Sequence, residues 1–156
     1  MESSEGVEEY VRRLSHLKAE VVAQRHPGTF VIGADTMLCH DGQLIGKPGD
    51  REHAVSMLEQ LNGRTHEVTS GFTVIAPGGD VETGVDTATV SMRKITASEI
   101  SEYVDRVRPF AFAGAYAIQG EGANLVERVD GSVDTVIGMP MGQVSSALVK
   151  LGYGET

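Results

Sequence analysis

The sequence predicts an α/β fold, with helices packed on a β-sheet within a single domain that spans residues 1–156. Two observations lead to this expectation. Four segments repeat apolar residues every three or four positions, which is the spacing of one buried face of a helix. Between them lie short runs rich in β-branched residues and stretches that alternate apolar with polar side chains, which are typical of strands. A chain of 156 residues suits one domain with a substantial core.

The four predicted helices have recognisable start and stop signals. The first covers about residues 7–26, and its inward stripe is expected to hold one cation among apolar residues: Val7, Tyr10, Val11, Leu14, Leu17, Lys18 and Val21. The second covers residues 51–61, the third follows a capping box at residues 96–99, and the last begins at residues 139–140. The signals that bound the helices are Pro27-Gly28, Asp50, Gly63, Thr96, Glu99, Pro109 and Gly152.

The strongest strand signal is a hairpin between residues 30 and 48. Phe30-Val31-Ile32 has the composition of a buried strand. Asp41-Gly42 is a two-residue turn signal, because both positions of such a turn need a positive φ. Leu44-Ile45 then forms the second arm, and Gly46-Lys47-Pro48 ends the hairpin with a cation on a rigid loop.

Three further regions are expected to form strands. Residues 64–75 predict either one long strand or two strands joined at Gly71. Residues 81–89 place valine or threonine at alternate positions, which favours an antiparallel strand with one face in water. Asp130-Gly131 predicts a second hairpin. Its expected arms are residues 124–129 and 133–137.

The charge and composition exclude several classes of partner. Thirteen basic and 22 acidic residues give a net charge of −9, whereas a nucleic acid polymer needs a basic surface. A small polyphosphate is still compatible with this charge if local cations and a divalent metal offset it. There is no signal peptide and no apolar run near 18 residues, so we expect a cytoplasmic protein that has no membrane partner. The single cysteine, Cys39, excludes an intrachain disulfide and a cysteine-rich zinc site.

Asp35 and Lys47 are the first candidates for a functional site. Asp35 ends a buried strand behind Gly33 and Ala34, whose small size leaves space for a bulky group near the carboxylate. Lys47 lies on the other arm of the same hairpin, so the two side chains could face one space. A carboxylate and an ammonium around an open pocket suit chemistry on a phosphorylated substrate with a metal ion. The alternative is a structural ion pair at the end of a strand.

Four further polar residues each have a functional and a structural interpretation. Lys18 interrupts an apolar stripe, a position from which lysine usually extends its ammonium into solvent. Gln119 lies in a loop of small residues and suits recognition of the Watson–Crick edge of a base, and the alternative is an ordinary surface turn. Arg64 and His66 lie where a strand begins, either as polar end residues or as part of a pocket wall.

Five sequence blocks stand in a fixed order along the chain. They are G-A-D-T at residues 33–36, G-K-P at 46–48, G-R-T-H-E-V at 63–68, G-A-Y-A-I-Q-G at 114–120 and V-I-G-M-P at 136–140. Each block alone is weak, but the order and spacing are specific as a set. Together they resemble the Maf family of nucleoside triphosphate pyrophosphatases, over nearly the whole chain.

The resemblance implies a fold and an assembly. A Maf/ITPase-like domain has a mixed, twisted sheet of about six strands, flanking helices and a cleft between two lobes. A homodimer is the oligomer that the family implies. An unrelated α/β domain is the weakest of the interpretations, because it leaves the ordered blocks unexplained.

The resemblance also implies a reaction. The family hydrolyses a nucleoside triphosphate between the α and β phosphates, which yields a nucleoside monophosphate and pyrophosphate. By analogy Asp35 is the general base, and Lys18 and Lys47 stabilise the phosphate charge. Mg²⁺ or Mn²⁺ would be held by the phosphates together with Asp35 or Glu2.

The same analogy predicts the residues that recognise the substrate. Thr36 and Gln119 are expected to shape the base preference, with Arg64 as a further substrate contact. The G-A-D-T and A-I-Q-G blocks resemble the branch that prefers dTTP and UTP, and modified pyrimidine nucleotides are further possible substrates.

The chain departs from the family at its start. The family begins with a strand and an S-x-S-P-R-R motif whose serine and arginines bind phosphate, and this sequence contains no such motif. By analogy the chain begins about 30 residues late, which would remove the first strand and the main phosphate clamp. A fragment, a misplaced start and a shortened relative are all open interpretations. The alternative to an active enzyme is therefore a catalytically silent protein of the Maf fold that binds nucleotides or regulates a partner.

Overall fold

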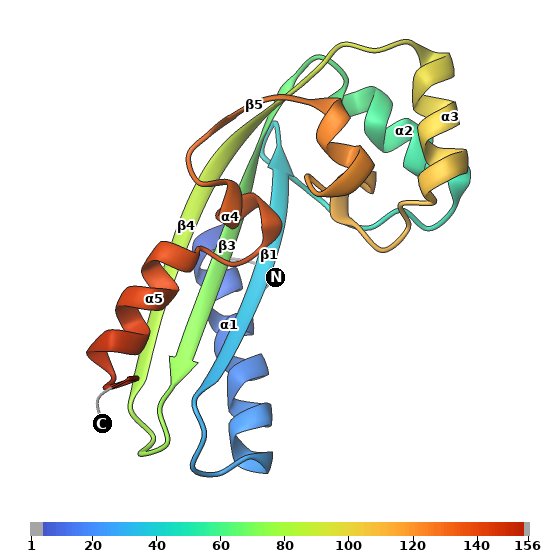
Figure 1. Ribbon diagram of the computed structural model, residues 1–156. Coiled ribbons are helices and arrows are strands. Elements are labelled where there is room, and N and C mark those ends of the chain that lie inside the picture. Colours follow the sequence, from blue (N-terminus) through green and yellow to red (C-terminus); the bar gives the residue numbers. More distant parts are fainter. Residues whose placement is uncertain (1–4, 155–156) are drawn as a thin grey trace. The chain divides into compact units, whose positions relative to one another are not determined.

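The computed structural model describes residues 5–154 and confirms the α/β fold. In chain order the elements are α1 (Val7–Arg25), β1 (Val31–His40), β2 (Gln43–Ile45), α2 (Arg51–Leu61), β3 (Thr65–Ile75), β4 (Val81–Met92), α3 (Ala97–Val107), the 3₁₀ turns η1 (Ala113–Ala115) and η2 (Gly120–Leu125), β5 (Val126–Asp130), α4 (Val133–Ile137) and α5 (Met141–Lys150) (Figure 1). The described strands form one five-stranded sheet in the order β2-β1-β3-β4-β5, where a mixed sheet of about six strands was expected. Its outer pairs, β1–β2 and β4–β5, are antiparallel.

The chain divides into two compact units. The first contains the described residues up to Thr36, together with Thr69–Thr87 and the described residues from Gly138 onward. The second contains Met37–Val68 and Ala88–Ile137. Strands β1, β3 and β4 each contribute residues to both units.

In the first unit, α1 packs directly on the backbone of two strands. A Cβ atom at Gly33 would lie 2.4 Å from the carbonyl oxygen of Ser15, and one at Gly71 would lie 2.6 Å from that of Val11. Both distances are shorter than any real Cβ contact, so only glycine allows the helix to approach β1 and β3 this closely. The two glycines thus fix the position of α1 along the sheet.

The buried line of α1 differs from the predicted stripe. Val11, Ser15 and Ala19 are fully buried, whereas Leu17 and Val21 are 44% and 48% exposed. The prediction was wrong for Leu17 and Val21 because the glycine surface of the strands accepts small side chains, and a line of small residues brings the helix closer than a line of large ones. The hydroxyl of Ser15 is satisfied by Thr73 on β3 at 3.0 Å.

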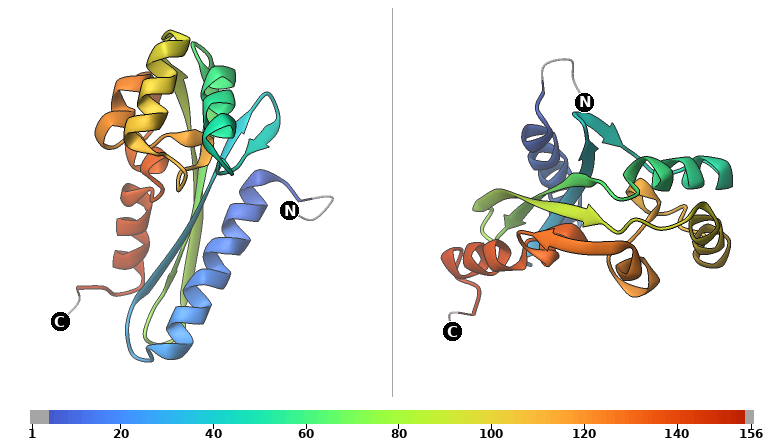
Figure 2. Two further views of the ribbon diagram at one scale, coloured as in Figure 1. Left: turned by 90° about the vertical axis from the view of Figure 1, so that its right-hand side faces the viewer. Right: turned by 90° about the horizontal axis from the view of Figure 1, so that it is seen from above.

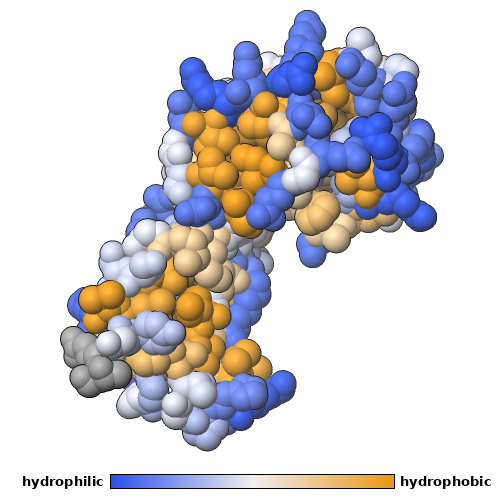
Figure 3. Space-filling model, in the orientation of Figure 1, coloured by the Kyte–Doolittle hydropathy of each residue, from blue (hydrophilic) through white to orange (hydrophobic). Residues whose placement is uncertain are grey.

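The opposite face of the sheet in this unit is covered by α5, and Figure 2 shows α1 and α5 on opposite sides of the strands. Side chains alternate along β3, so that Phe72 and Val74 pack with Val144 and Ala147 of α5. The outer side of α5 is partly apolar (Figure 3), and Val149 there is 66% exposed.

The second unit has its own apolar core between α2, α3 and the adjoining strands. Asp50 accepts a hydrogen bond from the backbone N–H of His53 at 2.8 Å and caps α2, as predicted. The predicted capping box of α3 is also present, with Thr96 and Glu99 bonded reciprocally. The largest apolar side chains buried in this core are Leu38, Met57, Leu58, Leu61, Met92, Ile100, Tyr103, Tyr116 and Leu125.

One predicted hairpin is wrong. Residues 133–137 form the short helix α4 and not a second strand, and β5 pairs with β4 in the register Thr89↔Asp130. Gly131 has a φ of 115°, so the Asp-Gly pair turns the chain out of the sheet. Thr135 is the fully buried residue of α4, so this short helix packs on the protein interior through its side chain.

The long segment over residues 64–75 is one continuous strand, β3, with Gly71 inside it. The predicted turn at Asp41-Gly42 is confirmed, since both residues have a positive φ, of 49° and 75°. None of the described helices combines the length and the hydropathy that crossing a membrane would require.

Replacing Gly33 with alanine should disrupt the packing of α1. The new methyl would overlap the backbone of Ser15 and Ala19, so we expect a loss of at least about 2 kcal/mol in the free energy of unfolding. Gly142→Ala is the matched control, because nothing lies within 4 Å of a Cβ there and alanine favours the helix. Urea denaturation compares the two, and equal stability of Gly33→Ala and the wild type would contradict this packing.

Candidate active site

The first unit holds an ion pair between Asp35 of β1 and Lys18 of α1. The Lys18 Nζ atom donates to Asp35 Oδ1 at 2.5 Å and to the Ala34 carbonyl oxygen at 3.2 Å. The Asp35 side chain is 12% exposed, whereas that of Lys18 is 55% exposed. The second carboxylate oxygen, Asp35 Oδ2, is buried and accepts no hydrogen bond from residues 5–154. One oxygen is therefore fixed by a cation, and the other is an acceptor without a donor among these residues.

This pairing is a consequence of how the helix packs. Gly33 lies two residues before Asp35, and Ala19 next to Lys18 is fully buried against it. The close approach brings the start of β1 within reach of the lysine, which turns out of the buried line of α1 toward the carboxylate. The Lys18 side chain is thus largely exposed, as lysine in an apolar stripe usually is, while its ammonium is bonded to Asp35.

Thr36, the next residue, is anchored by a different set of contacts. Its Oγ1 atom lies 2.7 Å from Ser70 Oγ and donates to the Gly138 carbonyl oxygen at 3.4 Å. All three residues belong to the first unit. The side chain of Thr36 is therefore held in one orientation, on the face of the sheet opposite to the Asp35 side chain.

In the second unit, Lys47 is exposed on the loop after β2 and lines a cavity of about 380 Å³. Two histidines share this cavity. His53 accepts a hydrogen bond from Gly49 N–H at its Nδ1 atom, and His40 donates from its Nδ1 atom to the Thr65 carbonyl oxygen at 2.9 Å. The cavity thus combines a free ammonium with two imidazoles, which is a suitable lining for an anion.

Two further predicted site residues, Gln119 and Arg64, lie on the surface of the second unit. Gln119 is exposed immediately before η2, and its side chain does not cap that turn. Arg64 is exposed just before β3, where its backbone bonds to Leu61 and Met92. Both belong to the second unit, with Lys47. Glu2 lies outside the described residues.

His66, in contrast, is a core residue and not a polar strand end. It is 2% exposed, and its Nε2 atom lies 2.7 Å from the hydroxyl oxygen of Tyr116. Burial, with a smaller contribution from His40, lowers the pKa of His66 to about 4, so the imidazole is neutral at pH 7. Burial also raises the pKa of the Tyr116 hydroxyl. The two side chains are a neutral, hydrogen-bonded pair.

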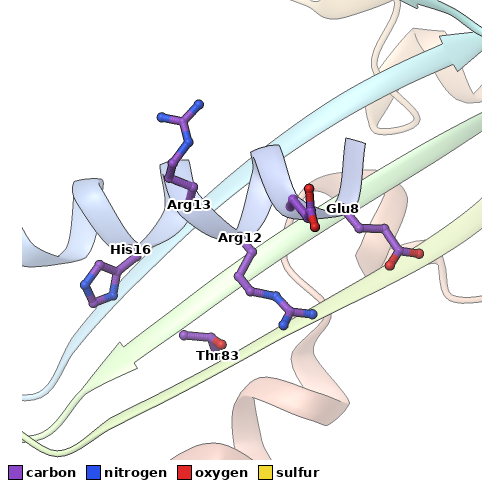
Figure 4. A pocket seen from close by; sticks show the side chains of 6 residues that line it. Glu8, Arg12, Arg13, His16 and Thr83 are labelled. Atoms are coloured by element: carbon purple, nitrogen blue, oxygen red, sulfur yellow. The ribbon is translucent and has the colours of Figure 1, made fainter. Parts of the chain in front are cut away.

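A further cavity of about 540 Å³ lies on the first unit between α1 and β4, and Figure 4 shows Arg12 reaching from the helix toward Thr83 while Arg13 points the other way. Glu8 and Glu9 line the same cavity. Because carboxylates and guanidinium groups are mixed there, the cavity has no preference for one sign of charge.

Asp35 offers one carboxylate oxygen to a divalent metal. Asp35 Oδ2 suits such an ion, because it is a buried carboxylate oxygen that lacks a donor. Within residues 5–154, however, no group of three or more His, Cys, Asp or Glu side chains is arranged to hold a metal. The donor set thus fits an ion that takes most of its ligands from phosphate oxygens and water, which is typical of Mg²⁺.

Sequence reasoning missed two of the contacts that shape these sites. Ser70, which fixes Thr36, is an unremarkable serine in a strand. Tyr116 is visible only as the one large polar side chain in a run of alanine and glycine. A tyrosine in such a run signals a buried hydroxyl in need of a partner, and that signal could have led to His66.

Comparison with known proteins identifies relatives over almost the entire chain. The family model described as Maf-like protein matches residues 1–151. A protein of Myxococcus xanthus named dTTP/UTP pyrophosphatase is 44% identical over 150 residues, which cover 96% of this chain and 76% of that protein. Proteins of the same name from Bacillus velezensis and Geotalea uraniireducens are 42% and 41% identical, and they cover 90% and 98% of this chain, with 74% and 79% of their own lengths matched.

The low pKa of His66 predicts an acid-sensitive fold. In the unfolded chain the imidazole titrates near pH 6.5, so between pH 6.5 and about 4 the unfolded state binds more protons than the folded state. Stability should therefore fall by about 3 kcal/mol as the pH drops through this window. Glutamine cannot titrate, so the His66→Gln variant should not show this loss. The difference in unfolding free energy between the wild type and the variant should therefore become smaller by that amount as the pH falls. A difference that stays constant with pH would contradict the burial of a neutral His66.

Proposed function

The chain belongs to the Maf-like protein family, and on that premise we propose that it is a nucleoside triphosphate pyrophosphatase with dTTP and UTP as substrates. The observation that carries the proposal is the Asp35 carboxylate, whose Oδ1 atom is fixed by Lys18 and whose Oδ2 atom is a buried acceptor without a donor in the described part of the chain. A fixed carboxylate with one free oxygen is what the activation of a water molecule requires.

The proposed reaction is hydrolysis of the bond between the α-phosphorus and its bridging oxygen. A water molecule donates a hydrogen bond to Asp35 Oδ2, and its oxygen attacks the α-phosphorus. The proton passes to the carboxylate as the bridging oxygen departs with pyrophosphate. General-base catalysis of this kind contributes about 10²–10⁴-fold to the rate.

Two lysines supply positive charge for this step. Lys18 keeps Asp35 Oδ1 occupied and is itself half exposed, so its ammonium can also approach a phosphate oxygen. Lys47 is free in its cavity, with His40 and His53 beside it, and would stabilise charge on the departing pyrophosphate.

A divalent cation is the implied cofactor. Asp35 Oδ2 or Glu2 would hold Mg²⁺ or Mn²⁺ together with phosphate oxygens of the substrate, and when bound the metal would neutralise charge on the polyphosphate. This requirement is part of the proposal, and omission of the metal from the assay tests it.

Recognition of the base falls to Thr36 and Gln119. The amide of Gln119 both donates and accepts, which matches the alternating edge of thymine or uracil. Thr36 is held by Ser70 and the Gly138 carbonyl, so its position is fixed before substrate binds. Arg64 is exposed and offers a guanidinium to the same substrate.

We also place the protein in the cytoplasm, where nucleoside triphosphates supply the polymerases, and propose a homodimer as its assembly. Light scattering at high protein concentration tests the second statement, because a mass of 16.6 kDa would identify a monomer.

The direct test of the function is release of pyrophosphate from dTTP, UTP, CTP and GTP with and without Mg²⁺ or Mn²⁺. Metal-dependent release that is fastest with dTTP and UTP would support the proposal. Nucleotide binding without release would favour the silent Maf-fold alternative.

Asp35→Asn should abolish activity but not folding. The amide keeps an oxygen for Lys18 but cannot take up a proton, so kcat should fall by about 10²–10⁴-fold while the melting temperature changes by less than about 3 °C. Asp105→Asn is the matched control, because Asp105 also pairs with a cation at 2.5 Å, Arg51, but lies on the exposed side of α3. Full pyrophosphate release by Asp35→Asn would remove Asp35 as the base.

A further inference from the structure

The loop that carries Gln119 is anchored to the loop that carries Lys47. The backbone N–H of Gly114 donates to the Gly46 carbonyl oxygen at 3.0 Å, and Gly46 immediately precedes Lys47. Gly114 has a φ of 68°, and a Cβ there would lie 2.9 Å from the side chain of Leu38. The first anchor thus fixes where residues 113–120 begin, in direct contact with the Lys47 loop.

A second anchor follows two residues later. The Tyr116 hydroxyl and His66 Nε2 are 2.7 Å apart, and the two rings meet edge to face with centroids 5.5 Å apart. Both residues are almost fully buried, at 5% and 2% exposure. Tyr103 of α3 lies with Tyr116 in the same buried core. Three residues beyond Tyr116, Gln119 emerges into solvent.

An ordinary apolar core does not need this polar pair. His66 Nδ1 is buried and has no hydrogen-bond partner among the residues that the structure describes, so the imidazole loses the hydration of two nitrogen atoms and regains one bond. A leucine and a phenylalanine would fill the same space without that cost. What the hydrogen bond adds is direction, since it admits one distance and one orientation between β3 and the Gln119 loop.

We propose that Tyr116 and His66 form a positioning pair that determines nucleobase selectivity, by holding the Gln119 amide at a fixed place relative to the Lys47 loop. This inference rests on the proposed function, because it concerns how the same site recognises its substrate. Gln119 touches the base, and the pair acts only through Gln119. Loss of the pair should therefore weaken discrimination between bases more than it slows the reaction.

The test is Tyr116→Phe, which removes the hydroxyl and keeps the ring. We expect the ratio of kcat/KM for dTTP to that for CTP to fall about tenfold, through the KM for dTTP, with kcat within about twofold of the wild type. Thr73→Val is the matched control. It removes the buried bond between Ser15 and Thr73, 3.0 Å long and in the first unit, and should leave the base ratio unchanged.

Two substitutions at His66 test the same hydrogen bond by changing the partner of the Tyr116 hydroxyl. The amide nitrogen of glutamine can take the place of Nε2, so His66→Gln should retain most of the selectivity. His66→Leu fills the space but offers no polar atom, and it should match Tyr116→Phe. If glutamine and leucine gave the same ratio as the wild type, the hydrogen bond would have no part in recognition.

Two results would overturn the inference. One is an unchanged base ratio in Tyr116→Phe, and the other is an equal fall in Thr73→Val, since selectivity would then follow general stability. If the wild type released no pyrophosphate from any nucleotide, the proposed function would fail separately. Amide hydrogen exchange would then decide the positioning role: it should accelerate across residues 113–120 in Tyr116→Phe but not in Thr73→Val, and equal exchange in both would refute it.

Discussion

The contact between α1 and the backbone of β1 is the constraint on which the first unit depends. At Gly33 the helix and the strand are too close for a side chain on the strand. The residues of the helix at this contact are Ser15 and Ala19, which are small and fully buried. Dispersion contacts at such short range are numerous and tolerate no added methyl group. The ion pair of Lys18 with Asp35 follows from this geometry. Lys18 directly precedes the buried Ala19, so the close packing of the helix brings its ammonium within hydrogen-bond distance of the carboxylate.

Local signals allowed much of the fold to be predicted. The turn at Asp41-Gly42 and the caps at Asp50 and Thr96 are each determined by residues within a few positions, so the sequence identifies them without the rest of the chain. The prediction of a strand over residues 133–137 was wrong for the opposite reason. Their strand-like composition is outweighed by Gly131, whose left-handed backbone redirects the chain, and by the burial of Thr135. The burial of Thr135 depends on packing against the rest of the folded chain, which local sequence signals do not specify.

The site was predictable only in part. The candidate residues Asp35, Lys47 and Lys18 stand out from their neighbours in the sequence, but the pairing of Asp35 with Lys18, 17 residues away on a helix, was not predicted. The bond between His66 and Tyr116 spans 50 residues. No periodicity or turn rule connects such positions, because their proximity is created by the pairing of strands and the path of a loop.

The proposed site residues are divided between the two units. Asp35, Lys18 and Thr36 belong to the unit in which α1 fixes a carboxylate, and Lys47, Arg64 and Gln119 belong to the unit in which His66 and Tyr116 fix a loop. Each group is positioned by hydrogen bonds within its own unit. If the proposed function holds, changes at His66 or Tyr116 would act through the loop of Gln119 and leave the Asp35–Lys18 pair intact, whereas changes beneath Gly33 would act on that pair and leave the loop intact.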